Sequence, residues 1–234
     1  MRILITAFEP FGGATTNITQ KIISLLPAQV GNKEIFTTCL PVSFQRAHII
    51  LQELIAQYQP DMFLLLGQCP EGEYIRLERF AMNMMDSQKA DNDGYCPSEQ
   101  VIYSNAPLAY RTPINIKTIV HHLQEEKLPV VVSNSAGLYV CNRVYYEALH
   151  LQQNTLFVHI PKNFDVNTAA VVINPNRSLD RNPFQFWLYT FTFCMLSILF
   201  GIFFVSFQSC SSLHSFKEAK KSTQKSLDNI YKIL

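Results

Sequence analysis

Over the first 180 or so residues, short apolar runs alternate with longer segments of helical period. The apolar runs have the length of buried strands and span 2–7, 34–40, 61–66, 130–133 and 155–159. The helical segments span 17–26, 43–58, 113–127 and 139–151. This alternation predicts an α/β domain of three layers, α/β/α, in which helices cover both faces of a central mixed, largely parallel and twisted sheet.

Two stretches depart from this alternation. Residues 86–113 hold Asp, Asn, Gly and Pro with little periodicity, so they are predicted to form a long surface loop of the kind that often carries function. After residue 159 no segment stands out as the helix that would close the domain. We therefore place the domain boundary by composition, with an α/β domain over 1–181 and a tail over 182–234.

The tail contains a run of 24 residues, 184–207, without a charged side chain. It is long enough to span a bilayer as an apolar helix, and the alternative is a terminal helix buried against the domain. Residues 215–234 carry lysines among apolar residues at helical spacing, which fits a short amphipathic surface helix. The excess of basic residues after the run favours a topology with the tail in the cytoplasm and the domain outside. The N-terminus, however, lacks a signal peptide, which favours a domain that stays in the cytosol. We prefer a tail-anchored domain that faces the cytosol.

The composition of the chain argues against several classes of function. The 19 basic and 18 acidic residues give a net charge of +1, which offers no electrostatic footprint for nucleic acid. No zinc-binding motif and no phosphate-binding glycine loop occurs, so neither a metal nor another cofactor is expected. The cysteines show no CxxC spacing and favour a reduced, cytosolic setting; they are Cys39, Cys69, Cys96, Cys141, Cys194 and Cys210.

Cys141 occupies the position of a nucleophile. It lies just inside a predicted helix that follows a strand and a loop of small residues, 133–137. The free N–H groups and the positive end of the helix dipole stabilise a thiolate there, and they can also receive an oxyanion. The alternative is a buried structural cysteine, because free cysteine is among the most buried residue types.

His159 is the strongest candidate for the general base. It ends an apolar strand that follows the Cys141 helix, so its imidazole can reach the thiol at the strand–helix turn. His150 lies nine residues after Cys141 on the same helix, which places it on the opposite side. The remaining histidines are expected to be solvated on or near surface helices; they are His48, His121, His122 and His214.

A carboxylate is needed to orient the imidazole. Glu78 is our first choice and Asp91 our second. The alternative for Glu78 is an ordinary surface carboxylate paired with Arg76 or Arg79.

Several of these segments, in this order, resemble the pyroglutamyl peptidase I family of cysteine peptidases, also called pyrrolidone-carboxylate peptidases. Residues 3–13 with Asn17 are similar to the family's opening strand and FxPFGG loop. Residues 67–68 and 77–83 match its GQ and ERxAxN elements, and 91–94 resemble its DNxG. Residues 135–142 match the nucleophile segment, and 159–161 the HxP. The resemblance covers about residues 1–180.

The resemblance implies a cysteine exopeptidase that hydrolyses the peptide bond after an N-terminal pyroglutamate through a thioester, without a cofactor. It implies a catalytic triad of Cys141, His159 and Glu78. Its substrate-binding residues would be Phe8 and Phe11, which flank the flat lactam, together with Asn17 and Gln68, which hold the loop and offer main-chain contacts. Core packing is the alternative role for the two phenylalanines. The partners implied are peptides that begin with pyroglutamate, and association into homo-oligomers is compatible with the family.

The chain also departs from the family pattern. Residues 67–73 read GQCPEGE where GQAGGR is usual, so an arginine is lost and acidic residues are gained. The Cys141–His159 spacing is shorter than usual, and the apolar tail is not implied by the family, whose members are normally soluble. A second hypothesis therefore stays open: a non-catalytic, membrane-tethered protein that binds pyroglutamyl peptides with the same fold.

Overall fold

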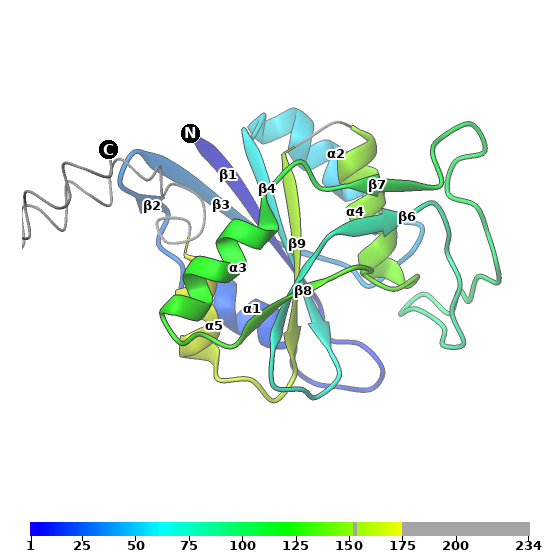
Figure 1. Ribbon diagram of the computed structural model, residues 1–234. Coiled ribbons are helices and arrows are strands. Elements are labelled where there is room, and N and C mark those ends of the chain that lie inside the picture. Colours follow the sequence, from blue (N-terminus) through cyan, green and yellow to red (C-terminus); the bar gives the residue numbers. More distant parts are fainter. Residues whose placement is uncertain (152–153, 175–234) are drawn as a thin grey trace, which may run out of the picture. The chain divides into compact units, whose positions relative to one another are not determined.

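The structure, a computed structural model, describes residues 1–151 and 154–174 (Figure 1). Within these residues a seven-stranded sheet has the order β2-β3-β1-β4-β9-β5-β8. The strands are β1 (Arg2–Phe8), β2 (Gln29–Val30), β3 (Lys33–Leu40), β4 (Met62–Cys69), β5 (Ile75–Glu78), β8 (Val130–Ser133) and β9 (Thr155–Pro161). A small separate ribbon pairs β6 (Phe80–Met82) with β7 (Ala109–Arg111).

Strand pairing in the sheet is mixed. β1 pairs in parallel with β3 and β4, β4 with β9, and β5 with β8. The β2–β3 and β5–β9 pairs are antiparallel. The carboxyl ends of β1, β4 and β9 therefore meet at one edge, and β5 starts at that same edge because it runs in the opposite direction.

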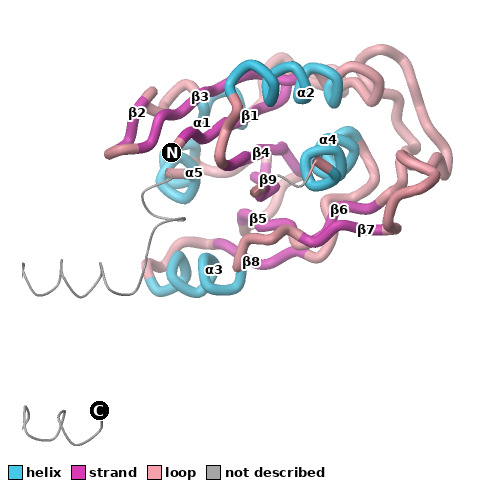
Figure 2. The backbone as a smooth tube through the Cα atoms, turned by 90° about the horizontal axis from the view of Figure 1, so that it is seen from above, coloured by secondary structure: helices cyan, strands magenta, loops and turns pink. Residues whose placement is uncertain are grey.

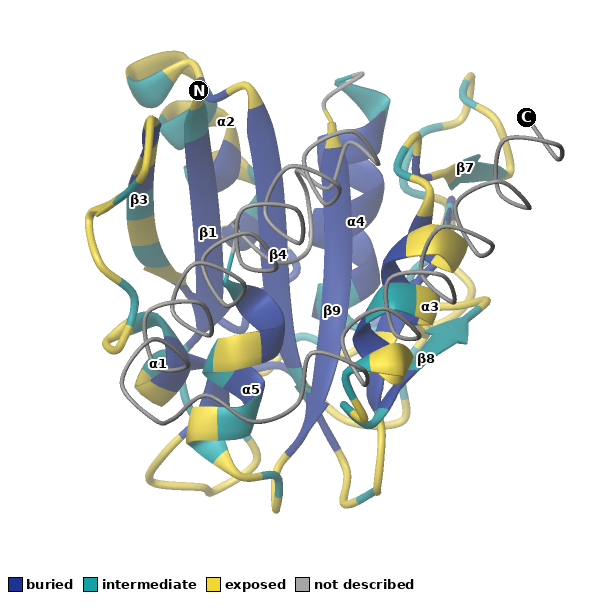
Figure 3. Cartoon of the chain, turned by 60° about the vertical axis from the view of Figure 1, so that its left-hand side comes forward, coloured by how far each residue is buried: buried dark blue, intermediate teal, exposed yellow. Residues whose placement is uncertain are grey.

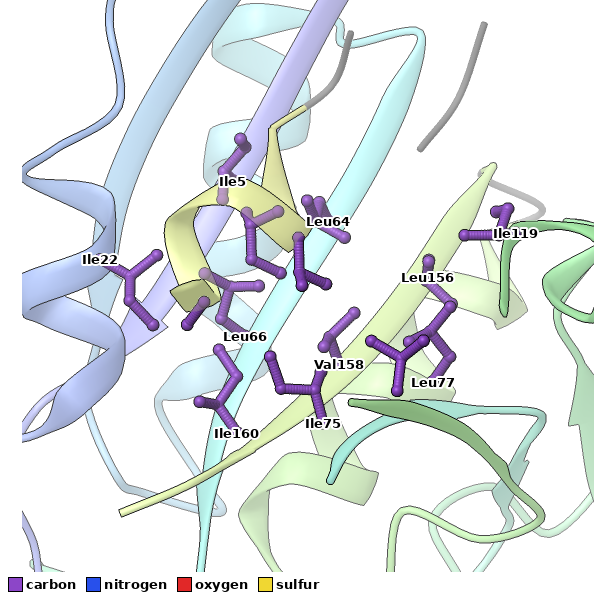
Figure 4. Packing of buried hydrophobic residues seen from close by; sticks show 14 of the residues in the cluster. Ile5, Ile22, Leu64, Leu66, Ile75, Leu77, Ile119, Leu156, Val158 and Ile160 are labelled. Atoms are coloured by element: carbon purple, nitrogen blue, oxygen red, sulfur yellow. The ribbon is translucent and has the colours of Figure 1, made fainter. Parts of the chain in front are cut away.

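Helices cover both faces of the sheet. They are α1 (Ile18–Ile23), α2 (Ala47–Tyr58), α3 (Ile116–Glu125), α4 (Val140–His150) and α5 (Val166–Ile173). One core cluster joins α1, α3 and α5 to the sheet, and a second joins α2 and α4 to the opposite face. Figure 2 looks down on the layers, Figure 3 shows the buried strands between them, and Figure 4 shows the isoleucine- and leucine-rich packing of the first cluster. Burial on both faces explains why β1 and β9 are almost continuously apolar.

The predicted α/β class with a mixed, largely parallel sheet is confirmed. Each of the five predicted strands and four predicted helices is present, with ends shifted by a few residues; β9, for example, continues past His159 to Pro161.

Some elements were missed. The prediction of an unbroken loop over 86–113 was wrong, because Ala109–Arg111 form β7 against β6. The closing helix is α5, which is only eight residues long, and β2, β5 and β6 have four residues or fewer. Elements this short carry too little periodicity to be recognised, so they depend on pairing with distant segments.

The predictions for the C-terminal region concern residues outside those that the structure describes. These are the apolar helix over 184–207, the amphipathic segment 215–234 and the tail 182–234 behind the domain 1–181. Among residues 1–151 and 154–174, none of the helices combines the length and the apolar character that a bilayer crossing requires.

Candidate active site

Cys141 is the second residue of α4 and is half-buried. The N-cap of α4, Tyr139, makes no side-chain capping hydrogen bond. By contrast, Asn17, Asn115 and Asp165 cap the N-termini of α1, α3 and α5 with their side chains. Because the first N–H groups of a helix have no partner within it, α4 presents uncapped donors and its positive dipole end beside the thiol.

Side chains of α4 anchor its first two turns to the neighbouring strands. Asn142 is fully buried; its Oδ1 accepts from Met82 N at 2.8 Å, and its Nδ2 donates to the carbonyls of Met82 and Met84, each at 2.9 Å. The hydroxyl of Tyr145 donates to the carbonyl of Glu78 at 2.9 Å. Asn142 and Tyr145 thus fix the start of α4, and with it the thiol of Cys141, against β5 and β6.

His159 lies on β9 and is 8% exposed. Its Nδ1 is 2.8 Å from Oε1 of Glu78, whose carboxylate can only accept, so Nδ1 donates and Nε2 is left for the thiol. Burial lowers the pKa of His159, but hydrogen bonds and charge interactions with Cys141 and Glu78 outweigh it and raise the pKa to about 9. The imidazole therefore holds a proton readily when the thiolate is present.

Glu78 ends β5 and is 1% exposed. Its Oε1 meets His159, whereas its Oε2 is buried and has no hydrogen-bond partner in the described part of the chain. An unpaired buried carboxylate oxygen is costly, so it calls for an explanation beyond packing.

A pocket of about 350 Å³ opens over these groups at the strand edge. Seven residues singled out from the sequence line it: Phe8, Phe11, Asn17, Gln68, Glu78, Cys141 and His159. Phe8 is also a buried member of the core cluster around α2 and α4, and Phe11 packs at its margin. The aromatic residues thus combine core packing with pocket lining, and the two roles considered for them are compatible.

Asn17 and Gln68 use their side chains to hold the pocket wall. Asn17 Nδ2 donates to the carbonyl of Glu9 at 3.1 Å, and its Oδ1 accepts from Thr19 N at 3.0 Å. Gln68 Oε1 accepts from Ile18 N at 2.9 Å. These bonds join the loop after β1, the start of α1 and the end of β4.

Asp91 does not line the pocket, and the carboxylate that reaches His159 is Glu78. Asp91 is buried and accepts from the backbone N–H groups of Phe44 at 2.8 Å, Tyr95 at 2.9 Å and Asp93 at 3.0 Å. Asp91 therefore stabilises the conformation of the loop between β6 and β7, and it does not orient the imidazole.

His150 points away from Cys141, as its helical position predicted. Its Nδ1 lies 3.0 Å from the hydroxyl of Tyr110, and its ring stacks on Tyr103. The group of described side chains close enough to hold a metal ion is His121, His122 and Glu125 on α3, none of which lines the pocket.

Several residues that line the pocket were not predicted from the sequence. Tyr139 lies against Phe11 and Phe44, and its hydroxyl donates to the carbonyl of Ala90 at 3.0 Å. Its place two residues before Cys141 could have drawn attention to it. Arg76 and Cys69 also line the pocket. Their sequence signal was weak, because Arg76 lies on a strand of only four residues and Cys69 lies in the altered GQ segment.

The sequence of this chain matches the family model described as pyroglutamyl peptidase over residues 1–172. The pyrrolidone-carboxylate peptidase of Thermococcus onnurineus is 40% identical over 167 residues, which cover 69% of this chain and 84% of that protein. Pyrrolidone-carboxylate peptidase 1 of Streptococcus pneumoniae is 36% identical over 182 residues, covering 75% and 83%.

Solved structures agree. The pyrrolidone carboxyl peptidase from Thermococcus litoralis superimposes with a TM-score of 0.71 at 32% identity, covering 76% of this chain and 93% of that one. The enzyme of that name from Fervidobacterium islandicum gives a TM-score of 0.71 at 34% identity, covering 74% and 94%. The similarity thus extends over the domain that carries the pocket.

Proposed function

Because this chain belongs to the pyroglutamyl peptidase family, we propose that it removes an N-terminal pyroglutamate from peptides, with Cys141 as nucleophile, His159 as general acid and base, and Glu78 as the group that orients the imidazole. The observation that carries this assignment is the contiguous arrangement of the three side chains at the uncapped start of α4, with His159 Nδ1 2.8 Å from Glu78 Oε1.

The reaction is acyl transfer. His159 Nε2 takes the thiol proton, and Cys141 Sγ attacks the carbonyl carbon of pyroglutamate, which gives a tetrahedral intermediate. The free N–H groups at the start of α4 stabilise its oxyanion. The imidazolium then protonates the leaving amine, the C–N bond breaks, and a thioester remains. Water, deprotonated by His159, hydrolyses the thioester and releases pyroglutamate and the thiol.

Binding of the lactam follows from the pocket walls. A neutral, flat ring offers no charge to grip, so it is best held between aromatic faces, and Phe8 and Phe11 supply these. Asn17 and Gln68 contribute by holding the loop that carries Phe11. The proposed substrates are peptides with an N-terminal pyroglutamate, as the family implies.

The test is release of a fluorophore from a pyroglutamyl amide. Wild type should turn it over, and Cys141→Ala should lose about 10³-fold or more in kcat/KM, as expected when a covalent nucleophile is removed. Cys39→Ala, an exposed cysteine outside the pocket, is the matched control and should retain activity. Equal turnover by wild type and Cys141→Ala would refute the assignment. Tight binding of pyroglutamyl peptides without thiol-dependent turnover would favour the non-catalytic binding protein.

For the tail we retain the sequence-based proposal of a membrane anchor over 184–207 on a cytosol-facing domain. It is supported by the uncharged 24-residue run alone. Fractionation of cells that express the full chain tests it: an anchored chain sediments with membranes and is released by detergent but not by alkaline carbonate. Light scattering of the purified chain tests self-association into a homo-oligomer.

A further inference from the structure

Arg76 is a cation in the active-site pocket whose side chain has no partner among residues 1–151 and 154–174. It is the second residue of β5, it is exposed, and it lines the pocket together with Cys141 and His159. In the described part of the chain its guanidinium makes neither a hydrogen bond nor an ion pair. Nearby cations are engaged: Arg79 donates to Asn134 at 2.8 Å, and Lys162 pairs with Glu71 at 3.2 Å.

The register of the sheet places Arg76 beside the reacting groups. β5 runs antiparallel to β9, and Arg76 is directly opposite His159. Paired residues of antiparallel strands project from the same face, with Cβ atoms about 4.5–5.5 Å apart. Glu78, two residues further along β5, projects from that face as well. Arg76 thus lies on the side of the sheet that α4 covers with Cys141.

The end of the Arg76 side chain lies over the loop between β4 and β5. Its Nη2 is 4.0 Å from the position that a Cβ on Gly72 would occupy. Its positive charge also lowers the pKa of the Cys69 thiol, although burial has the larger, opposite effect on that pKa. The acidic residues of the loop do not neutralise it, since Glu71 pairs with Lys162 and Glu73 is within ion-pair distance of no described cation.

The order of the strands indicates how a bound substrate is oriented across the site. From β1 the sheet continues to β4, β9 and β5 (Figure 2). One residue on each of these strands therefore follows the next along the edge, in the order Phe8, Gln68, His159 and Arg76. If the lactam sits against Phe8 and the scissile bond faces Cys141 and His159, then the residue after pyroglutamate extends toward β5. Arg76 therefore stands on the leaving-group side.

We propose that Arg76 binds a carboxylate in the leaving part of the substrate, so that the enzyme favours pyroglutamyl peptides with an acidic group directly after the scissile bond. This rests on the proposed function. The group is either the free C-terminus of a pyroglutamyl dipeptide or an acidic side chain in the residue after pyroglutamate. Both present the planar carboxylate that the guanidinium fork pairs with in bidentate fashion.

The test compares kcat/KM for three substrates: pyroglutamyl-alanine, its C-terminal amide, and pyroglutamyl-glutamate with an amidated C-terminus. Arg76→Gln should lower kcat/KM about three- to tenfold for the first, the third or both, because partly exposed charge pairs are weak and a guanidinium–carboxylate fork is among the stronger of them. It should leave the amide of pyroglutamyl-alanine within twofold. The affected substrate identifies the source of the carboxylate, and its preference should weaken as salt is raised.

Two further variants test whether Arg76 acts by direct contact with the substrate carboxylate or only through the positive electrostatic potential of the region. Arg76→Lys keeps the charge but not the fork and should lose less than Arg76→Gln. Lys162→Gln removes one positive charge directly after β9, from a side chain that does not line the pocket, and should leave the ratio of kcat/KM for acidic and neutral substrates unchanged. The proposal is overturned if Arg76→Gln lowers all three substrates equally, if it changes none, or if Lys162→Gln has the same acid-specific effect.

Failure of the proposed function would look different, because wild type would then turn over none of the three substrates. Calorimetric binding of pyroglutamyl-alanine and its amide would decide the inference in that case. Pyroglutamyl-glutamate with an amidated C-terminus is measured beside them. Tighter binding of either acidic ligand than of the neutral amide, abolished by Arg76→Gln, supports the inference, and equal binding of all three by wild type rejects it.

Discussion

Glu78 and Glu147 are both 1% exposed, and Glu147 belongs to α4 whereas Glu78 is bonded to it through Tyr145, yet the surroundings of the two carboxylates differ. Glu147, near the end of α4, accepts hydrogen bonds from Gln52 at 2.5 Å, Tyr103 at 2.6 Å and Arg143 at 2.6 Å. Glu78, beside the start of α4, has His159 on one oxygen and no described partner on the other. A buried carboxylate with all its donors fixes packing, whereas one that is left short of donors remains available to stabilise a charge that changes during reaction.

The titration behaviour of the two regions differs in the same way. Burial raises the pKa of Glu147, but the hydrogen bonds from Tyr103, Arg143 and Gln52 outweigh it and lower the pKa overall. At the other end it is His159 whose pKa is raised, to about 9. We infer that one end of α4 is a structural clamp and the other is the reactive end.

The largest expected effect comes from Glu78→Gln. The amide keeps the size of the side chain but removes the charge that holds the Nδ1 proton and the imidazolium, so kcat/KM for a pyroglutamyl amide should fall about 10²- to 10⁴-fold. Thermal unfolding should change little. Activity within threefold of wild type would show that Glu78 is not the orienting group.

Glu147→Gln should give the opposite pattern. It leaves Arg143, which is 5% exposed, as an unpaired buried charge, and the free energy of unfolding should fall by about 3 kcal/mol in urea titrations. Well below the melting temperature, kcat/KM should stay within threefold of wild type. The control is Glu125→Gln, whose carboxylate is exposed, with an expected change within about 0.5 kcal/mol. A large loss of activity without loss of stability would contradict the division of α4 into two ends.

Gly67→Ala should affect both properties moderately. A Cβ on Gly67 would lie 2.7 Å from Phe157 Cε1 and 2.9 Å from His159 Cδ2, so the imidazole has to move. We expect a loss of about 1–3 kcal/mol in stability from overpacking and about a tenfold loss in kcat/KM from misplacement of the base. At Gly72 the nearest atom would be Pro161 Cγ at an ordinary 3.6 Å, so Gly72→Ala is the matched control. Full activity of Gly67→Ala would mean that the position of the ring is not critical.

The smallest expected effect is a difference between His159 and Glu147 in how their contributions to stability depend on pH. Because the pKa of His159 is raised from 6.5 to about 9, its stabilising contribution is complete below pH 6.5 and is lost as pH rises through about 9. Because the pKa of Glu147 is lowered from 4.5, its contribution is present above pH 4.5 and is lost as pH falls. Unfolding free energies between pH 3 and 10 check both signs.

In that experiment the difference between wild type and His159→Gln should shrink toward high pH. The difference between wild type and Glu147→Gln should shrink toward low pH. If both differences shrank at the same end of the range, one of the two assignments would be wrong.

Much of the site could be predicted from local sequence. A cysteine at a strand–helix turn, a histidine at a strand end and aromatic residues in a glycine loop each have a recognisable local setting, and the pocket brings them together. Glu78 was harder, since its alternative as a surface carboxylate was locally just as good. Its four-residue strand becomes visible only through pairing with β8 and β9, which are more than 50 residues away in sequence.

The periodicity of apolar residues was sufficient to determine the α/β class and the long elements, because burial of a strand or a helix face follows from its own residues. Only the tertiary structure decided which carboxylate meets His159, that Asp91 is satisfied by backbone donors, and that the Arg76 side chain lines the pocket with no partner in the described part of the chain. Those outcomes depend on strand order and register, which arise from contacts between distant segments and leave no periodic trace in the local sequence.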